Sequence, residues 1–166
     1  MSSRFVHLHL HTEFSLADSI IRVPEKPDHA DPKKAKQANL LSRAVELGMP
    51  ALAVTDRNNL FALVKFYKAA EGVGIKPIAG ADVMVAEGGE APWPVTLLCR
   101  DREGYLSLSR LLSRAWMEGH RTDGVAIEPE WLRADHQGLF AIIGRQSLAG
   151  RLALTGDGRA VRFERG

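Results

Sequence analysis

The sequence has little cysteine and no long hydrophobic segment. Cys99 is the single cysteine among 166 residues, which excludes an intramolecular disulfide and a zinc site built from several cysteines. No apolar run reaches the ~18 residues that a membrane span requires. The first 18 residues contain Arg4, three histidines and Glu13, a composition unlike that of a secretory signal. These absences favour a soluble protein of the reducing cytoplasm, with no membrane partner.

The chain also lacks a strong excess of charge. It has 22 basic and 20 acidic side chains, for a formal net charge of +2, far short of a nucleic-acid-binding tail. Hydrophobic residues make up 45% and charged residues 25%, which is ordinary for a globular domain and argues against disorder. A chain of this length fits one domain.

Short apolar runs bounded by turn residues predict the strands. Residues 50–55 read PALAVT, a run typical of a strand buried on both faces. Residues 4–10 alternate two residue types, as a half-exposed strand does. The predicted strands are residues 4–10, 50–55, 76–85, 95–100 and 138–143.

Helical spacing predicts helices between these strands. One helix begins at Asn59, with Leu60, Leu63, Val64 and Tyr67 facing inward. Another covers residues 101–119, with Asp101 as its cap and Leu108, Leu111, Leu112 and Trp116 in the core. The remaining helices are expected at residues 33–47, stopped by Gly48, and at 129–134 and 147–154.

The alternation of strands and helices predicts an α/β fold with a mostly parallel sheet, either open or closed as a barrel. Ligands of such folds bind at the carboxyl ends of the strands. The polar residues that follow each strand are therefore the candidates for a functional site.

Three of the six histidines lie in the first predicted strand or directly after it. His7, His9 and His11 alternate, so they point to one face, while Val6, Leu8 and Leu10 face a core. Two imidazoles at this spacing can reach one zinc, manganese or iron ion. The alternative is a half-exposed strand whose polar face happens to be histidine, and the sequence leaves the two readings about equal.

Three aspartates are further candidates. Asp56 directly follows a buried strand, where a ligand or general base would lie, or else it caps the next helix in competition with Asn58 or Asn59. Asp82 lies on a strand and, taken alone, is more typical of an exposed polar position. Asp18 follows the first strand by a turn and is more often a turn residue than a ligand.

The run Phe5–Ser19, FVHLHLHTEFSLADS, resembles the PHP (polymerase and histidinol phosphatase) domain that begins the alpha subunit of bacterial, most closely proteobacterial, DNA polymerase III. The resemblance continues through GMPALAVTD (48–56), LFALVKFYK (60–68) and GIKPIAGADV (74–83), and it covers nearly the whole chain in order. It implies a distorted (β/α)7 barrel with a metal centre in its mouth. Residues 1–166 would form the N-terminal, incomplete part of that domain, with the polymerase palm, fingers and thumb beyond Gly166.

The resemblance also implies a metal site that has lost ligands. His9 and His11 match the family's HxH motif, with His7 one step before it. Asp18 matches an acidic turn residue, Asp56 matches the Asp of a TDHG motif, and Asp82 stands where metal-binding members have Glu. Arg57, Pro94 and Arg145 occupy positions where other members place ligands, and a guanidinium cannot ligate a metal.

Two functions follow from the resemblance. The first is a non-catalytic scaffold of the chromosomal replicase that docks the proofreading exonuclease (epsilon) subunit. In that case the intact protein is a DNA-directed DNA polymerase that uses Mg²⁺ and reaches DNA mainly through its other domains. The fragment alone would be inactive, with no tightly bound cofactor and at most residual Zn²⁺ or Mn²⁺. The alternative is a metal-dependent phosphoesterase or 3′–5′ exonuclease, whose chemistry needs a complete multi-metal site.

Overall fold

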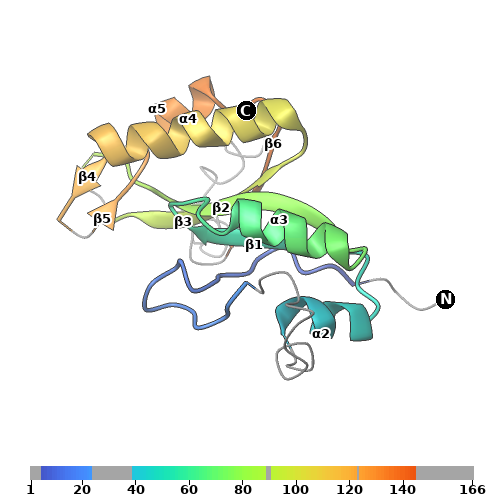
Figure 1. Cartoon of the computed structure of the whole chain (residues 1–166). Helices are drawn as coiled ribbons and strands as arrows, with labels where there is room; N and C mark the ends of the chain where they lie inside the picture. Colours follow the sequence, from blue (N-terminus) through green and yellow to red (C-terminus); the bar gives the residue numbers. More distant parts are fainter. Residues whose placement is uncertain (1–4, 24–38, 89–90, 123, 145–166) are drawn as a thin grey trace, which may run out of the picture. The chain divides into compact units, whose positions relative to one another are not determined.

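The computed structural model describes residues 5–23, 39–88, 91–122 and 124–144 (Figure 1). The chain divides into two compact units, Met1–Ala81 and Asp82–Gly166. The elements in chain order are α2 (Leu40–Glu46), β1 (Ala51–Arg57), α3 (Leu63–Gly72), β2 (Lys76–Val85), β3 (Trp93–Cys99), α4 (Arg102–Glu118), β4 (His120–Arg121), β5 (Gly124–Val125), α5 (Pro129–Ala134) and β6 (Leu139–Ile142). Helices and strands alternate, which confirms the predicted α/β class.

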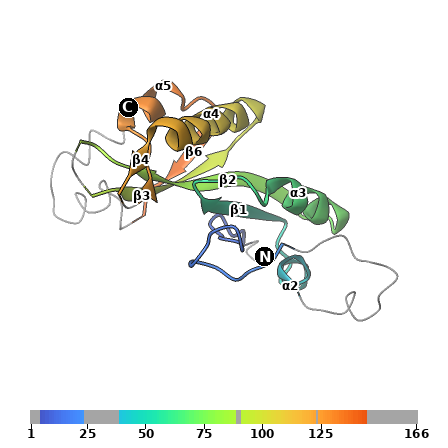
Figure 2. The same ribbon diagram turned by 60° about the vertical axis from the view of Figure 1, so that its left-hand side comes forward.

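Strand β1 forms the centre of the first unit, beside the first half of β2. Its first six residues, Ala51–Asp56, are all buried. The predicted run 50–55 is confirmed for Ala51–Thr55, whereas Pro50 is exposed. Leu52 and Val54 belong to a core with Leu41 of α2 and Phe66 of α3. Figure 2 shows the ribbons of β1, α2 and α3, which supply these residues. Burial on both faces fixes the strand firmly, so its carboxyl end is a rigid support for the residues that follow.

Helix α2 begins at a capping box that the sequence analysis missed. The Asn39 side chain accepts hydrogen bonds from the backbone N–H groups of Leu41 and Ser42, and Ser42 Oγ accepts one from Asn39 N. The helix ends before Gly48, whose φ of +66° suits a residue without Cβ, as predicted. Most of the predicted beginning, residues 33–38, lies outside the described residues.

The inward face of α3 differs from the prediction. Ala62, Phe66 and Ala70 are buried, whereas Val64 and Tyr67 are exposed. The predicted phase was wrong because the buried residues recur every four positions on a different face, and the helix begins at Leu63 rather than Asn59. The preceding turn contains Asn58 at a φ of +51°, a conformation that asparagine tolerates better than most residues. Two alanines on the buried face let the helix approach the core closely.

The N-terminal segment is extended but is not a regular strand. A single parallel bridge joins His7 to Leu52, and the backbone N–H groups of Ala53 and Thr55 donate to the carbonyls of His7 and Leu10. Leu10 N donates to Thr55 Oγ1 at 2.9 Å instead of to a backbone carbonyl, which interrupts the ladder. Leu8 is exposed, so the prediction that it faces a core was wrong.

In the second unit, the end of β2 is followed across the sheet by β3 and then β6. Strand β6 pairs antiparallel with β3, with Leu97 opposite Ala141. The expectation of a mostly parallel sheet was therefore wrong for this pair. The connection from β3 to β6 contains α4, the β4–β5 ribbon and α5, and it is long enough for either strand direction. The alternation of strands and helices alone therefore did not determine the direction of β6.

Helix α4 agrees with the prediction except at Trp116. Asp101 Oδ1 accepts a hydrogen bond from Gly104 N at 3.0 Å and caps the helix. Leu108, Leu111 and Leu112 are buried, but Trp116 is 48% exposed. Ala115 completes the buried stripe one position earlier, so Trp116 falls outside it. The predicted helix at 147–154 lies outside the described residues.

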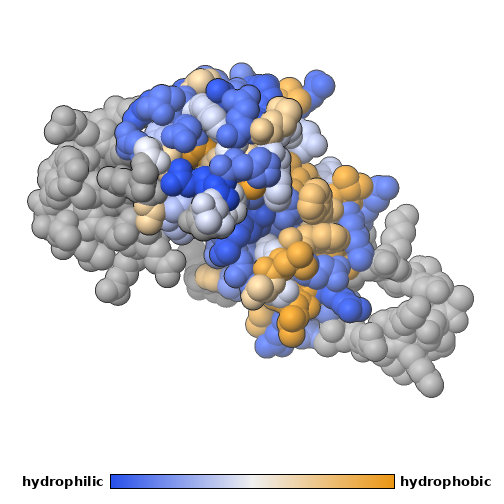
Figure 3. All heavy atoms as spheres, turned by 90° about the vertical axis from the view of Figure 1, so that its left-hand side faces the viewer, coloured by the Kyte–Doolittle hydropathy of each residue, from blue (hydrophilic) through white to orange (hydrophobic). Residues whose placement is uncertain are grey.

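Several apolar side chains reach the surface among polar ones (Figure 3). In the first unit, the exposed large apolar residues include Leu16, Ile20, Phe61 and Val64. Among the described residues, no helix combines the length and apolar character needed to cross a membrane.

Candidate functional site

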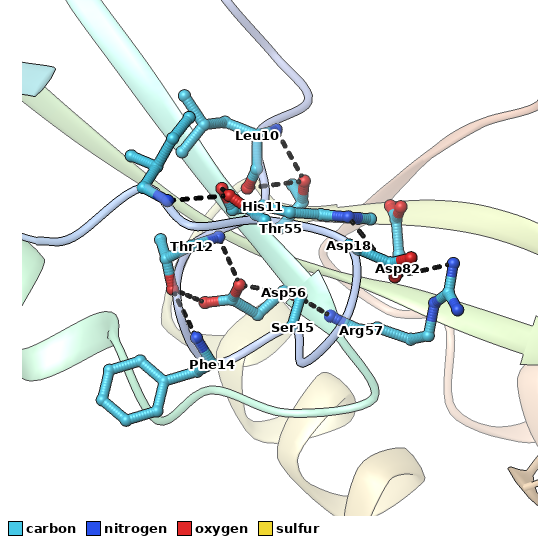
Figure 4. Close-up of polar contacts among 12 residues, drawn as sticks. Leu10, His11, Thr12, Phe14, Ser15, Asp18, Thr55, Asp56, Arg57 and Asp82 are labelled. Carbon is cyan, nitrogen blue, oxygen red and sulfur yellow. Dashed lines mark hydrogen bonds and ion pairs between the residues drawn. The ribbon is translucent and has the colours of Figure 1, made fainter.

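The carboxyl end of β1 and the loop of residues 12–18 form the candidate site. The loop is a run of turns, in which Ser15 N donates to Thr12 O and Asp18 N donates to Ser15 O. Strand β1 ends with Asp56 and Arg57. These two consecutive residues contact opposite ends of the loop (Figure 4).

Asp56 is buried and accepts three short hydrogen bonds from the loop. Its Oδ1 accepts from Thr12 N at 2.6 Å and from Ser15 Oγ at 2.6 Å, and its Oδ2 accepts from Thr12 Oγ1 at 2.7 Å. The side chain does not cap α3, whose N-cap residue is Ala62, so that alternative was wrong. Asp56 instead ties the loop to β1.

Thr12 and Ser15 are the residues that sequence reasoning missed at this site. Both side chains are buried, and Ser15 Oγ also accepts a hydrogen bond from Arg57 N at 3.0 Å. The signal in the sequence was a pair of hydroxyl residues three positions apart in a turn. Such pairs are common in turns, so the signal could not have identified the contact with Asp56.

Asp18 pairs with a guanidinium. Arg57 Nη2 lies 2.9 Å from Asp18 Oδ2, and His11 Nδ1 lies 3.9 Å from the same oxygen (Figure 4). The side chains of Asp18 and Arg57 are 28% and 51% exposed, so water partly screens this pair. Arg57, predicted above to replace a metal ligand, thus supplies a positive charge to the candidate ligand Asp18.

The histidines are arranged differently from one another. The rings of His9 and His11 lie 5.0 Å apart between centroids, whereas the ring of His7 packs edge-on against Phe5. Asp82, on β2, is buried and accepts a hydrogen bond from Thr96 Oγ1 at 2.5 Å. His9 and His11 both belong to the first unit, whereas Asp82 is the first residue of the second. The two imidazoles are a possible metal-binding pair.

The other two lost-ligand positions add no donor among the described residues. Pro94 is a half-buried residue of β3, and a proline side chain has no atom that binds a metal. Arg145 lies outside the described residues.

Within the part of the chain that the structure describes, the candidate donors do not fit a multi-metal centre. Asp56 uses both carboxylate oxygens in hydrogen bonds, and Asp18 faces Arg57. A centre of several ions needs bridging carboxylates that can turn to the metal, and both described candidates near β1 are engaged otherwise. The two imidazoles of His9 and His11 suit at most a single ion.

The chain matches the family described as "PHP domain" over residues 7–162. It is 71% identical over 156 residues to the DNA polymerase III subunit alpha of Xylella fastidiosa (strain Temecula1), covering 93% of this chain and 13% of that protein. The subunit of the same name in Pseudomonas aeruginosa is 44% identical over 95% of this chain, and that of Escherichia coli K12 is 39% identical over 95%. The chain therefore spans about an eighth of the length of these curated relatives, 12% and 13% in the latter two.

Resemblance to solved structures is distant. An amidohydrolase from Chromobacterium violaceum, with bound sulfate and no metal, superposes with a TM-score of 0.42 at 20% identity. The match covers 95% of this chain and 52% of that one. The family match extends over nearly the whole sequence, and the chain therefore belongs to the PHP domain family, corresponding to the PHP domain of DNA polymerase III alpha subunits.

Proposed function

We propose that this chain is a non-catalytic PHP domain that serves as a scaffold within a bacterial replicase. The intact protein is then a DNA-directed DNA polymerase of the chromosomal replicase, which uses Mg²⁺ and nucleotides and works in the cytoplasm. The polymerase palm, fingers and thumb belong to the remaining part of that protein and make its main contacts with DNA. The identity to alpha subunits across 93% of the chain supports this assignment.

The ion pair of Arg57 with Asp18 carries the non-catalytic part of the proposal. A guanidinium stays protonated in proteins and has no lone pair for a metal. At 2.9 Å from Asp18 Oδ2 it balances the carboxylate charge, which a metal ion would balance in a metal-binding relative. A cation approaching Asp18 would meet both the repulsion of Arg57 and the loss of this pair.

A metal-dependent phosphoesterase or 3′–5′ exonuclease is the second candidate. The proximity of His9 and His11 favours it, because two imidazoles could bind one Zn²⁺ or Mn²⁺ ion. The described candidates do not supply the further ligands that a multi-metal hydrolase uses to activate water and stabilise the leaving oxygen. Binding of a residual single ion would therefore be weak and without hydrolysis.

The proposed partners are the rest of the alpha subunit, the replicase holoenzyme and the proofreading exonuclease (epsilon) subunit. A PHP domain without its own nuclease chemistry leaves proofreading to a separate protein. The PHP domain would then act through a surface that binds the exonuclease subunit, and not through its metal site.

Two assays on the full-length protein test the proposal. We expect primer extension in Mg²⁺ and no 3′-exonuclease activity in Zn²⁺ or Mn²⁺, with wild type, His9→Ala and the surface variant His136→Ala behaving alike. A 3′-exonuclease activity that His9→Ala abolishes and His136→Ala retains would instead establish the second candidate. Failure of the purified full-length protein to extend a primer would contradict the polymerase assignment.

A further inference from the structure

The contacts of Asp56 form a closed hydrogen-bond network within the first unit. Each of the three hydrogen bonds that Asp56 accepts is short enough to be charge-assisted. Each hydroxyl also accepts a bond, because Phe14 N donates to Thr12 Oγ1 at 3.3 Å and Arg57 N donates to Ser15 Oγ at 3.0 Å. Among the described residues, no buried side-chain nitrogen or oxygen lacks a hydrogen-bond partner.

The network positions an exposed aromatic side chain. Phe14 lies between Thr12 and Ser15, and its carbonyl accepts from Asn59 Nδ2 at 3.0 Å. Asn59 Oδ1 in turn accepts from Phe61 N at 3.1 Å, and the rings of Phe14 and Phe61 meet edge-on at 6.2 Å between centroids. The loop is thereby joined both to β1 and to the turn that begins α3.

We propose that Thr12, Ser15 and Asp56 form a metal-independent latch, the Asp56 latch, which holds the loop of residues 12–18 on β1. The hydrogens of Thr12 N, Thr12 Oγ1 and Ser15 Oγ all point at the Asp56 carboxylate, so they present positive ends to any cation that approaches it. A metal could bind Asp56 only by displacing at least one of these donors. Hydrogen bonds to Asp56 therefore hold the loop. If Asp56 bound a metal instead, the loop would lose at least one of these bonds.

The inference rests on the proposed function, because it gives a structural role to a position that metal-binding relatives use as a ligand. The two ideas fail separately. Exonuclease activity would overturn the proposed function, whereas the latch concerns only which groups hold the loop.

Hydrogen–deuterium exchange on the full-length protein tests the latch. We compare wild type with Asp56→Ala and with the double variant Thr12→Val/Ser15→Ala, and use Glu13→Gln as the matched control. Glu13 lies on the same loop but contacts Arg22 and Lys65 instead of the latch. Peptides within residues 11–22 should exchange about tenfold faster in both latch variants, because a lost bond to a charged group weakens local closure by roughly that factor.

The control variant and a metal chelator complete the test. Glu13→Gln should leave the exchange unchanged, and EDTA should leave wild-type exchange unchanged. Exchange in peptides from α4 should not change in any variant. If it does, the fold is disturbed more widely, and the milder single variant Thr12→Val replaces the latch variants; its exchange in residues 11–22 should again be faster than in wild type. Unchanged exchange in the latch variants, or faster wild-type exchange in EDTA, would overturn the latch.

Discussion

Arg57 Nη2 and Asp18 Oδ2 lie 2.9 Å apart, and through this contact the last residue of β1 reaches the end of the loop that begins at Thr12. The preceding residue, Asp56, holds the beginning of the same loop. Two adjacent side chains of opposite charge thus attach both ends of one loop. This arrangement leaves little of the carboxylate surface near β1 for a metal.

Arg57→His should not create a hydrolase. The substitution offers an imidazole and removes the cation next to Asp18, but the hydrogen bonds of Asp56 and the missing donor at Pro94 remain. A 3′-exonuclease assay in Zn²⁺ and Mn²⁺ should give no activity above the wild-type background. Turnover that depends on the new histidine would show that only one ligand had been lost.

Gly104→Ala should strongly destabilise the fold. A Cβ at Gly104 would run into the backbone of Gly138, so α4 could not keep its contact with the turn before β6. We expect a loss of ~2–3 kcal/mol in the free energy of unfolding, as for other overpacked sites. Urea unfolding of the 166-residue chain measures it.

Gly72→Ala is the matched control for that substitution. A Cβ at Gly72 would meet open space, and its φ is not in the left-handed region. As a residue of α3, it should gain about 0.5–1 kcal/mol of stability from the better helix propensity of alanine. Equal destabilisation by the two variants would contradict the packing described at Gly104.

Asp101→Asn should change the pH dependence of stability. Hydrogen bonding from Gly104 N, followed by the Arg100 guanidinium, lowers the pKa of Asp101 below its ordinary value of 3.8. A lowered pKa stabilises the fold above the ordinary value, and this contribution is lost as pH falls through the folded-state pKa. Asparagine keeps the helix cap without the charge.

The comparison is made by urea unfolding of wild type and Asp101→Asn between neutral pH and pH values well below 3.8. The advantage of wild type should be complete near neutral pH and should shrink in acid. A difference that stays constant across this range would mean that the charge of Asp101 contributes nothing.

Cys99 should react slowly with alkylating reagents. Burial, followed by the nearby Asp101 charge, raises the pKa of its thiol from 9.0 to about 11. Because the thiolate is the nucleophile, alkylation by iodoacetamide near pH 8 should be about 100-fold slower than for an ordinary thiol. Peptide mass spectrometry follows the modification, and reaction at the ordinary rate in the folded protein would contradict this pKa.

The sequence predicted the parts of the fold that depend on local patterns. The burial of Ala51–Thr55 in β1 followed from the short apolar run PALAVT. Asp101 was recognised as a helix cap from its place before an amphipathic segment. Both depend on neighbours in sequence. The prediction for the inward face of α3 was wrong because apolar residues lie on more than one face of this helix, and spacing alone did not show which face meets the core.

The candidate site was predicted less completely, since its contacts join residues about 40 positions apart. The family resemblance pointed to Asp56 and Asp18, but it could not show that Thr12 and Ser15 donate hydrogen bonds to the carboxylate of Asp56. Nor could it identify Asp18 as the partner of Arg57. The antiparallel pairing of β6 was missed because strand direction depends on the whole path between β3 and β6.

The central claim is that this PHP domain holds its loop and charges without a multi-metal centre. The most direct test is the metal content of the full-length protein after dialysis, measured by mass spectrometry with Zn²⁺ and Mn²⁺ supplied beforehand, alongside the His9→Ala variant as the background from other domains. The account predicts at most one weakly held ion attributable to His9. Three tightly held ions per chain that are lost in His9→Ala would contradict it.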